Sequence, residues 1–256
     1  PAEAQVTATS TLNVREAPSG KIIGSISRND SVKVVDFYGE WAKIIYGNGF
    51  AFVHSGYLLL SNHSLLDNIT IVVDPGHGGR DPGAVYNGIQ EKDIVLDISM
   101  ILERNLRTTG ADIVMTRTSD TYLSLEDRSQ IANRANGDIF VSIHANASPS
   151  NHSEIRGAET WWNQRGNKDS ELLAEKVQRR IIQFTNTVDR GVKDPLSQGY
   201  GDWHVTRETK MPSILIETGF LTNAKEARLL QDKNYQELVA NAIYQGILDF
   251  YIAKYM

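Results

Sequence analysis

Short apolar runs separated by turn-forming residues fill the first 60 positions of the chain. Val, Ile and aromatic residues alternate with polar ones in these runs, and Pro, Gly, Asn or Asp follows most of them. Such alternation is typical of half-buried strands joined by tight turns. The pattern predicts a small all-β barrel of five strands, at residues 12–15, 22–26, 31–37, 41–46 and 50–53.

A different pattern begins near residue 68, after a short polar connection. Nearly continuous apolar runs are typical of strands that are buried on both faces, and they occur at 69–74, 138–144 and 213–217. Further strands are predicted at 111–115 and 157–162. Apolar residues at helical spacing alternate with the strands and predict helices at 92–106, 124–135, 170–185, 224–230 and 235–253. This alternation predicts an α/β domain whose mixed, mostly parallel sheet is flanked by helices.

Three of the predicted strands lead into side chains suited to catalysis. His77 follows the first buried strand in a glycine-rich loop, His144 ends the second, and Glu217 ends the third. Sites in open α/β sheets form beyond the carboxyl ends of the strands. We therefore expect these three side chains to lie at the same end of the sheet.

Two imidazoles and one carboxylate form a typical catalytic zinc set, which leaves a fourth position for water. His77 and His144 are the candidate imidazoles, and a carboxylate near either of them would complete the set. Spacing alone does not select this carboxylate, and the candidates are Glu91, Asp74, Asp81, Asp93 and Glu217.

Composition narrows the class of protein. The 256 residues carry a formal net charge of -5, which argues against a nucleic-acid-binding protein that neutralises phosphates. No run approaches the length of a membrane span, and the absence of cysteine excludes disulfides and thiolate metal sites. The first four residues contain neither an initiator Met nor a signal-peptide pattern, so we expect a processed or trimmed terminus.

The N-terminal motifs, taken in order, resemble those of a bacterial SH3 (SH3b) domain. The resemblance implies an SH3-like barrel over residues 1–61 that binds cell-wall material, followed by a linker over 62–67. The motifs that carry it are LNVR at 12–15, PS at 18–19, IG at 23–24, VKV at 32–34, WAKI at 41–44 and GFAFVH at 49–54.

The motifs of the second part, over residues 68–256, resemble the zinc-dependent N-acetylmuramoyl-L-alanine amidases of the Amidase_3 type. Four motifs occur in the family's order, and Arg117 and Arg128 also match its pattern. The four motifs are DPGHGG at 74–79, EKD at 91–93, SIHAN at 142–146 and ETGFLTN at 217–223. Each motif alone is weak, whereas the ordered set is specific.

This resemblance implies that His77, Glu91 and His144 bind Zn²⁺ and that Glu217 is the catalytic glutamate. The implied reaction is hydrolysis of the amide between the lactyl group of N-acetylmuramic acid and L-alanine of the stem peptide. Zinc would activate water and polarise the carbonyl, while Glu217 would move the proton to the leaving amine. The implied partner is peptidoglycan, and we expect a monomeric bacterial protein that is secreted and associated with the cell wall.

Two other functions are compatible with these residues. A zinc peptidase or a deacetylase acting on cell-wall material could use the same ligands and would differ in the bond that it cuts. A non-catalytic cell-wall-binding protein could carry a degenerate amidase domain. Degeneration would be expected to remove a ligand or the catalytic glutamate, and this chain keeps all four residues.

Overall fold

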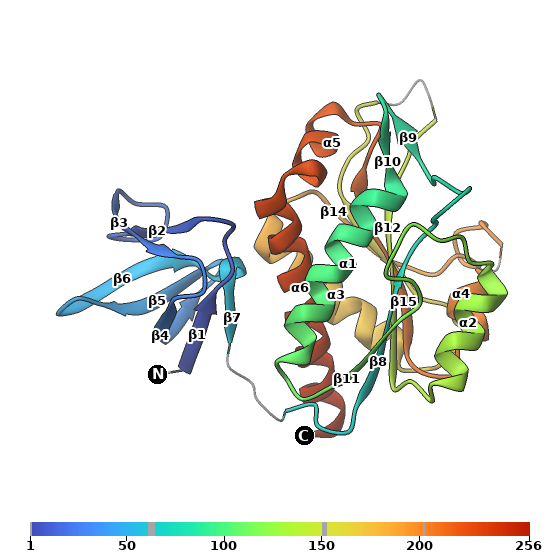
Figure 1. Ribbon diagram of the computed structural model, residues 1–256, viewed down its shortest axis with the longest axis horizontal. Helices are drawn as coiled ribbons and strands as arrows, with labels where there is room; N and C mark the ends of the chain where they lie inside the picture. The colour runs from blue at the N-terminus through green and yellow to red at the C-terminus, as the bar shows by residue number, and fades with distance from the viewer. Residues whose placement is uncertain (1, 61–64, 150–152, 202) are drawn as a thin grey trace.

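The computed structural model describes residues 2–60, 65–149, 153–201 and 203–256. The linker predicted over 62–67 therefore lies partly outside the described residues. Two bodies stand side by side in Figure 1, an all-β body formed by residues 2–60 and a larger α/β body. We call them the β domain and the α/β domain. No helix in the described ranges is both long enough and apolar enough to cross a membrane.

The β domain is a single antiparallel sheet of seven strands, two more than predicted. The two additional strands come from the ends of the segment and pair with each other. The strand order is β3-β2-β6-β5-β4-β1-β7, and among the described residues no pairing joins β3 to β7. The elements are β1 (Ala2–Val6), β2 (Thr11–Arg15), β3 (Ile22–Ser27), β4 (Ser31–Tyr38), β5 (Trp41–Tyr46), β6 (Gly49–His54), a 3-10 helix η1 (Ser55–Tyr57) and β7 (Leu58–Leu60).

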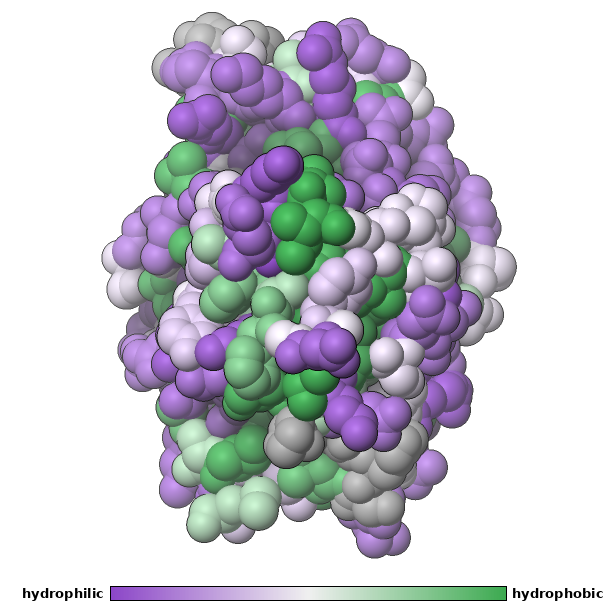
Figure 2. Space-filling view, turned by 90° about the vertical axis from the view of Figure 1, so that its left-hand side faces the viewer, coloured by the Kyte–Doolittle hydropathy of each residue, from purple (hydrophilic) through white to green (hydrophobic). Residues whose placement is uncertain are grey.

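The outer face of the β domain carries apolar side chains. Figure 2 looks onto this face and shows apolar groups gathered among polar ones near its centre. The exposed apolar residues of this domain are Ile22, Ile23, Val35, Phe37, Tyr38, Ile45 and Phe50. Clustered apolar groups on a surface are typical of a binding face.

The α/β domain is built on a six-stranded mixed sheet of order β11-β8-β12-β15-β13-β14. All neighbouring strands are parallel except β13 and β15, which confirms the predicted mostly parallel sheet. The strands are β8 (Thr70–Pro75), β11 (Asp112–Met115), β12 (Ile139–Asn146), β13 (Ala158–Trp161), β14 (Asp189–Lys193) and β15 (Ser213–Phe220), and a separate hairpin consists of β9 (Val85–Tyr86) and β10 (Ile89–Gln90).

Helices cover both faces of this sheet, as predicted (Figure 1). Side chains alternate along each strand, so Ile71 and Val73 of β8 pack with α1, α3 and α6, whereas Val72 packs with α2 and α4. The helices are α1 (Glu91–Arg107), α2 (Leu125–Arg134), α3 (Ser170–Thr185), α4 (His204–Glu208), α5 (Ala224–Gln231) and α6 (Lys233–Tyr255). The predicted capping box of α2 is present, because the Ser124 side chain accepts from the Asp127 amide and the Asp127 carboxylate accepts from the Ser124 amide.

The β domain packs against α6. Asn241 of α6 is fully buried and donates hydrogen bonds to the carbonyl oxygen of Gly56 (2.6 Å) and the hydroxyl of Thr7 (2.8 Å). It also accepts a hydrogen bond from the side chain of Asn105 in α1 (2.6 Å). Leu59 of the β domain belongs to the apolar core of the α/β domain. The two domains therefore share buried polar and apolar contacts.

Asn241→Ala is expected to destabilise the folded protein, because it leaves buried groups of Thr7, Gly56 and Asn105 without a partner. The free energy of unfolding should fall by about 1–3 kcal/mol for loss of buried hydrogen bonds, as measured by urea denaturation. Asn234→Ala is the matched control, since Asn234 accepts from Thr9 across the same interface at an exposed position. An equal effect of both substitutions would contradict the importance of the buried network.

Candidate metal centre

The loop that follows β8 brings backbone and side chains so close together that glycine is required. A Cβ atom on Gly76 would lie 2.3 Å from Cε1 of His144, and one on Gly83 would lie 2.4 Å from Oε2 of Glu91. His77 itself has a left-handed φ of 57°, which costs a non-glycine residue about 1–2 kcal/mol. The loop therefore holds His77 in a strained conformation next to the other two side chains.

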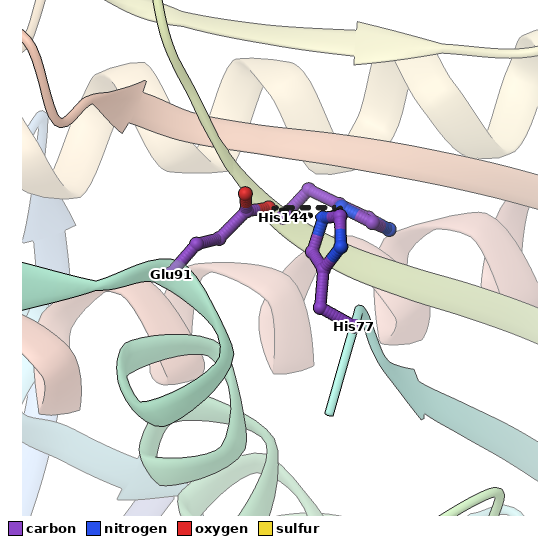
Figure 3. A group of neighbouring side chains, drawn as sticks. All are labelled: His77, Glu91 and His144. Atoms are coloured by element: carbon purple, nitrogen blue, oxygen red, sulfur yellow. Dashed lines mark hydrogen bonds and ion pairs between the residues drawn. The ribbon is translucent and has the colours of Figure 1, made fainter. Parts of the chain in front are cut away.

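His77, Glu91 and His144 form one cluster, and their side chains point toward one another (Figure 3). Nε2 of His77 lies 3.2 Å from Nδ1 of His144. Oε1 of Glu91 lies 3.1 Å from Nε2 of His77 and 3.0 Å from Nδ1 of His144. His77 comes from the loop after β8, Glu91 from the first turn of α1, and His144 from β12. Three separate elements thus converge on a triangle of donor atoms.

Neighbouring groups orient two of these side chains. Asp81 Oδ2 lies 2.8 Å from Nδ1 of His77; if that nitrogen donates to Asp81, the lone pair of Nε2 faces the cluster. The carboxylate of Glu91 accepts hydrogen bonds from the backbone amides of Ala84 (2.8 Å) and Ala145 (3.0 Å). The donor atoms of His77 and Glu91 are therefore held in position by the surrounding structure.

The cluster favours an ionised carboxylate between the imidazoles. Burial alone would raise the pKa of Glu91, but hydrogen bonds from His144 and His77 outweigh burial and hold this pKa below its usual range. Burial also acts to lower the pKa of His77, and the carboxylates of Glu91 and Asp81 outweigh it and raise that pKa. Hydrogen bonds and charges within the cluster therefore cause both shifts.

These donors fit a divalent zinc ion. Two imidazole nitrogens and one carboxylate oxygen are the donor types of catalytic zinc sites, and donors about 2.0–2.1 Å from a tetrahedral ion lie about 3.3 Å from each other. The three separations of 3.0–3.2 Å are close to that edge length. The buried Oε2 of Glu217, which has no hydrogen-bond partner in the described ranges, indicates a further polar group in this cavity.

Glu217 lies on β15 beside His144 of β12, in direct register with it. Glu217 as a whole is half-buried, although its Oε2 atom is fully buried. Burial, followed by the nearby carboxylates of Glu91 and Glu159, raises the pKa of Glu217 well above its usual value. A carboxyl group with a raised pKa in a cleft is a candidate for proton transfer.

His77, His144 and Glu217 face a common cavity of about 480 Å³. One part of its lining is polar and the other is apolar. The lining residues are Asp74, His77, Asp81, Tyr122, Leu123, Leu125, Arg128, His144, Trp203, His204, Val205, Leu215 and Glu217. His204 also lies in this lining and pairs with Glu126 at 3.2 Å.

The structure separates the carboxylates that spacing alone could not rank. Glu91 is the carboxylate in the cluster. Asp74 is fully buried and binds Arg128, Thr116 and Ser142, Asp81 contacts the far nitrogen of His77, and Asp93 is exposed.

Glu159 is a buried residue near the site that the sequence did not single out. It lies opposite Glu217 on β13, and its carboxylate pairs with Arg190 (2.8 Å) and Lys193 (2.5 Å). Burial alone would raise the pKa of Glu159, but these two cations outweigh burial and lower it. In the sequence, Glu159 could have been noticed as a single acidic residue within a predicted strand.

Comparisons with known proteins match both parts of the chain. Residues 71–249 match the family model described as N-acetylmuramoyl-L-alanine amidase (Amidase_3), and residues 10–58 match that of the bacterial SH3 domain (SH3_3). The N-acetylmuramoyl-L-alanine amidase LytC of Bacillus subtilis is 40% identical over 185 residues, which cover 71% of this chain and 35% of LytC. The probable cell wall amidase LytH of Staphylococcus epidermidis is 30% identical over 262 residues, which cover 96% of this chain and 84% of LytH.

A solved structure agrees with the fold. The crystal structure of an N-acetylmuramoyl-L-alanine amidase from Clostridium difficile 630 superposes with a TM-score of 0.68 and 37% identity, over 77% of this chain and 100% of that one. The first curated relatives are longer proteins. The chain spans 35% of LytC and 45% of an uncharacterized cell wall amidase of Bacillus anthracis.

Proposed function

The chain belongs to the N-acetylmuramoyl-L-alanine amidase family, and on this basis we propose that it hydrolyses the amide between N-acetylmuramic acid and L-alanine in peptidoglycan. One observation carries the proposal. Two histidines and a glutamate converge on one point, and beside them lies Glu217, whose buried Oε2 atom has no hydrogen-bond partner among the residues that the structure describes. A water molecule and an amide carbonyl are the reactants that such a cavity suits.

In this proposal His77, Glu91 and His144 hold a Zn²⁺ ion. When bound, zinc supplies a Lewis acid that polarises the amide carbonyl and lowers the pKa of water towards about 7. Asp81 fixes the orientation of His77, and the amides of Ala84 and Ala145 fix Glu91. These contacts keep two of the three donors in place before any metal arrives, which limits the ordering that binding requires.

Glu217 acts as the proton-transfer group. Its carboxylate accepts a proton from the attacking water and then donates that proton to the nitrogen of the leaving L-alanine. The same group must therefore be a base first and an acid afterwards, which is most efficient when its pKa lies near the working pH. Burial and the carboxylates of Glu91 and Glu159 move the pKa of Glu217 upward, in that direction.

The β domain would hold the enzyme on its substrate. The exposed apolar side chains of this domain, which include Ile22 and Phe50, support a role in binding cell-wall material. We propose a wall-binding domain over 1–61, a linker over 62–67, a catalytic domain over 68–256, and action as a monomer outside the cell at the wall. The ranges of the two family matches, 10–58 and 71–249, support this division.

The direct test is digestion of purified peptidoglycan followed by mass spectrometry of the products. Release of free stem peptides with an N-terminal L-alanine is expected, together with glycan strands that keep the lactyl group. Peptides cut between two amino acids would indicate a peptidase instead, and loss of acetyl groups would indicate a deacetylase. Binding to the wall without any cleavage would indicate a non-catalytic wall-binding protein.

Gly76→Ala is expected to weaken zinc binding although it changes no ligand. The new Cβ atom would collide with the imidazole of His144, because only 2.3 Å separates the two positions. The zinc dissociation constant should rise at least about 10-fold, the scale on which misplaced ligands act, as measured by competition with a chromophoric chelator. Gly49→Ala in the β domain is the matched control, since a Cβ there meets nothing within 4 Å.

A further inference from the structure

Arg117 and Arg128 were matched to the family pattern without an assigned role, and the structure shows what they contact. Both residues are almost completely buried, at 4% and 3% exposure. Arg117 donates from Nε to the Pro75 carbonyl (3.0 Å) and from Nη2 to the Gly76 carbonyl (2.7 Å). Arg128 donates from Nη1 to the Pro75 carbonyl and from Nη2 to the His77 carbonyl, both at 2.7 Å.

Three successive carbonyl groups, those of Pro75, Gly76 and His77, are thus held by two guanidinium groups. His77 is the first of three successive residues with a positive φ, 57° at His77, 124° at Gly78 and 58° at Gly79, and it is the non-glycine among them. Such a conformation persists only where the surroundings over-determine it. The hydrogen bond from Arg128 to the carbonyl of His77 itself supplies part of that constraint.

Arg117 also connects this loop to the helix that carries the next donor. Its Nη2 atom donates to the Lys92 carbonyl at 2.9 Å, and Lys92 follows Glu91 in the first turn of α1. The planar guanidinium reaches carbonyls of the loop and of α1 at the same time, which a lysine ammonium on its flexible stem does not reproduce. Arg117 therefore links the backbone just before His77 to the backbone just after Glu91.

We propose that Arg117 and Arg128 are positioning residues that clamp the His77 loop and so set the affinity of the metal centre. The proposal rests on the zinc site of the proposed function. It assigns these arginines to the backbone of the loop and not to a carboxylate of the substrate. Four hydrogen bonds from each side chain run to groups of the protein, the remaining partners being Ser119 and Lys92 for Arg117, and Asp74 and Leu123 for Arg128.

The direction in which the zinc affinity changes, after an arginine is replaced, distinguishes a positioning role from a purely electrostatic one. Removing a cation near a cation-binding site strengthens binding of the metal on Coulomb grounds alone. Loss of the clamp instead releases His77 and weakens binding. Contacts that orient metal ligands typically contribute about 10- to 100-fold to affinity, so a weaker affinity after removal of a positive charge would identify positioning.

The experiment measures the zinc dissociation constant of the full chain by competition with a chromophoric chelator. Arg117→Met and Arg117→Lys are both expected to raise this constant about 10- to 100-fold, since lysine keeps the charge but cannot reach all the carbonyls. The visible spectrum of the Co²⁺-loaded protein should change in the same variants. Arg28→Met is the matched control, because Arg28 also donates to two successive carbonyls, those of Thr7 and Ala8 in the β domain, and should leave the constant unchanged.

Arg117 is the better test position, since Arg128 also pairs with the buried Asp74 and its loss could unfold the protein. Far-UV circular dichroism identifies the folded variants, and Arg117→Lys carries the test if Arg117→Met does not fold. A folded Arg117 variant with wild-type or tighter zinc affinity would overturn the clamp. If the wild-type protein itself bound no zinc, the metal centre of the proposed function would fail and the clamp with it. If the wild type and the variants all bound zinc tightly, the clamp proposal would be wrong, whereas the proposed metal centre would stand.

Discussion

Glu217→Gln is expected to lower the rate of amide hydrolysis about 10²- to 10⁴-fold, the contribution typical of a general acid–base group, and to leave the zinc content unchanged. Glutamine keeps the size of the side chain but cannot accept and return a proton. The carboxyl group lies beside the cluster and not among its donor atoms, which is why the metal should remain. The rate is measured on soluble muropeptides, so that binding to an insoluble wall does not enter.

The stability of this variant gives a second readout. Burial and two neighbouring carboxylates oppose ionisation of Glu217, so a neutral amide should not destabilise the metal-free fold. Loss of activity without loss of folding or zinc would then be a chemical effect. Glu171→Gln serves as the control, because Glu171 is exposed on α3. Full activity of Glu217→Gln would refute the assignment of the proton-transfer group.

The strands and helices that the sequence predicted are those with a strong apolar period. Helix 170–185 was predicted with the bounds that α3 has, and the three buried strands β8, β12 and β15 lie side by side as the motif positions required. Their neighbouring places in the sheet bring His77, His144 and Glu217 to one end. Both family resemblances, to the amidases and to the bacterial SH3 domain, are confirmed by the matches to the chain.

Elements held by tertiary contacts were not visible in the sequence. Strand β14 contains Asp, Arg, Gly and Lys, so it has no apolar run, and pairing with β13 at the edge of the sheet maintains it. The two-residue strands of the β9–β10 hairpin and the five-residue helix α4 are too short to show a period. Strand β7 pairs with β1, which also pairs with β4, so strands far apart in the sequence hold β1 and β7 in the sheet.

At the metal centre, too, the sequence alone could not predict every feature. Spacing could not rank Glu91 above Asp74, because Asp74 ends a predicted strand, Glu91 directly precedes a predicted helix, and both lie near His77 in the sequence. What separates them is the environment of each carboxylate. The Asp74 carboxylate meets Arg128 and two hydroxyl groups, which outweigh its burial and lower its pKa, whereas Glu91 meets two imidazoles. Only the folded chain brings these partners together.

Substitution of a metal ligand is expected to have the largest effect of all. His144→Ala removes one of three donors, so zinc binding and amide hydrolysis should be lost together. Its residual activity should therefore fall below that of Glu217→Gln, which keeps the metal. Elemental analysis of the purified protein measures the zinc, and His54→Ala in the β domain, where the histidine caps η1, should keep the wild-type content.

Removal of the metal from the wild-type protein should reproduce this loss reversibly. Dialysis against a chelator is expected to abolish hydrolysis, and added Zn²⁺ should restore it. A ligand that binds only the folded state stabilises it by about 4 kcal/mol at a concentration 1,000 times its dissociation constant, so zinc should also raise the melting temperature of the wild type and of Glu217→Gln. It should not raise that of His144→Ala. This pattern separates a metal-binding role from a proton-transfer role, because activity alone is low in both variants, whereas only the ligand variant loses its thermal response to zinc.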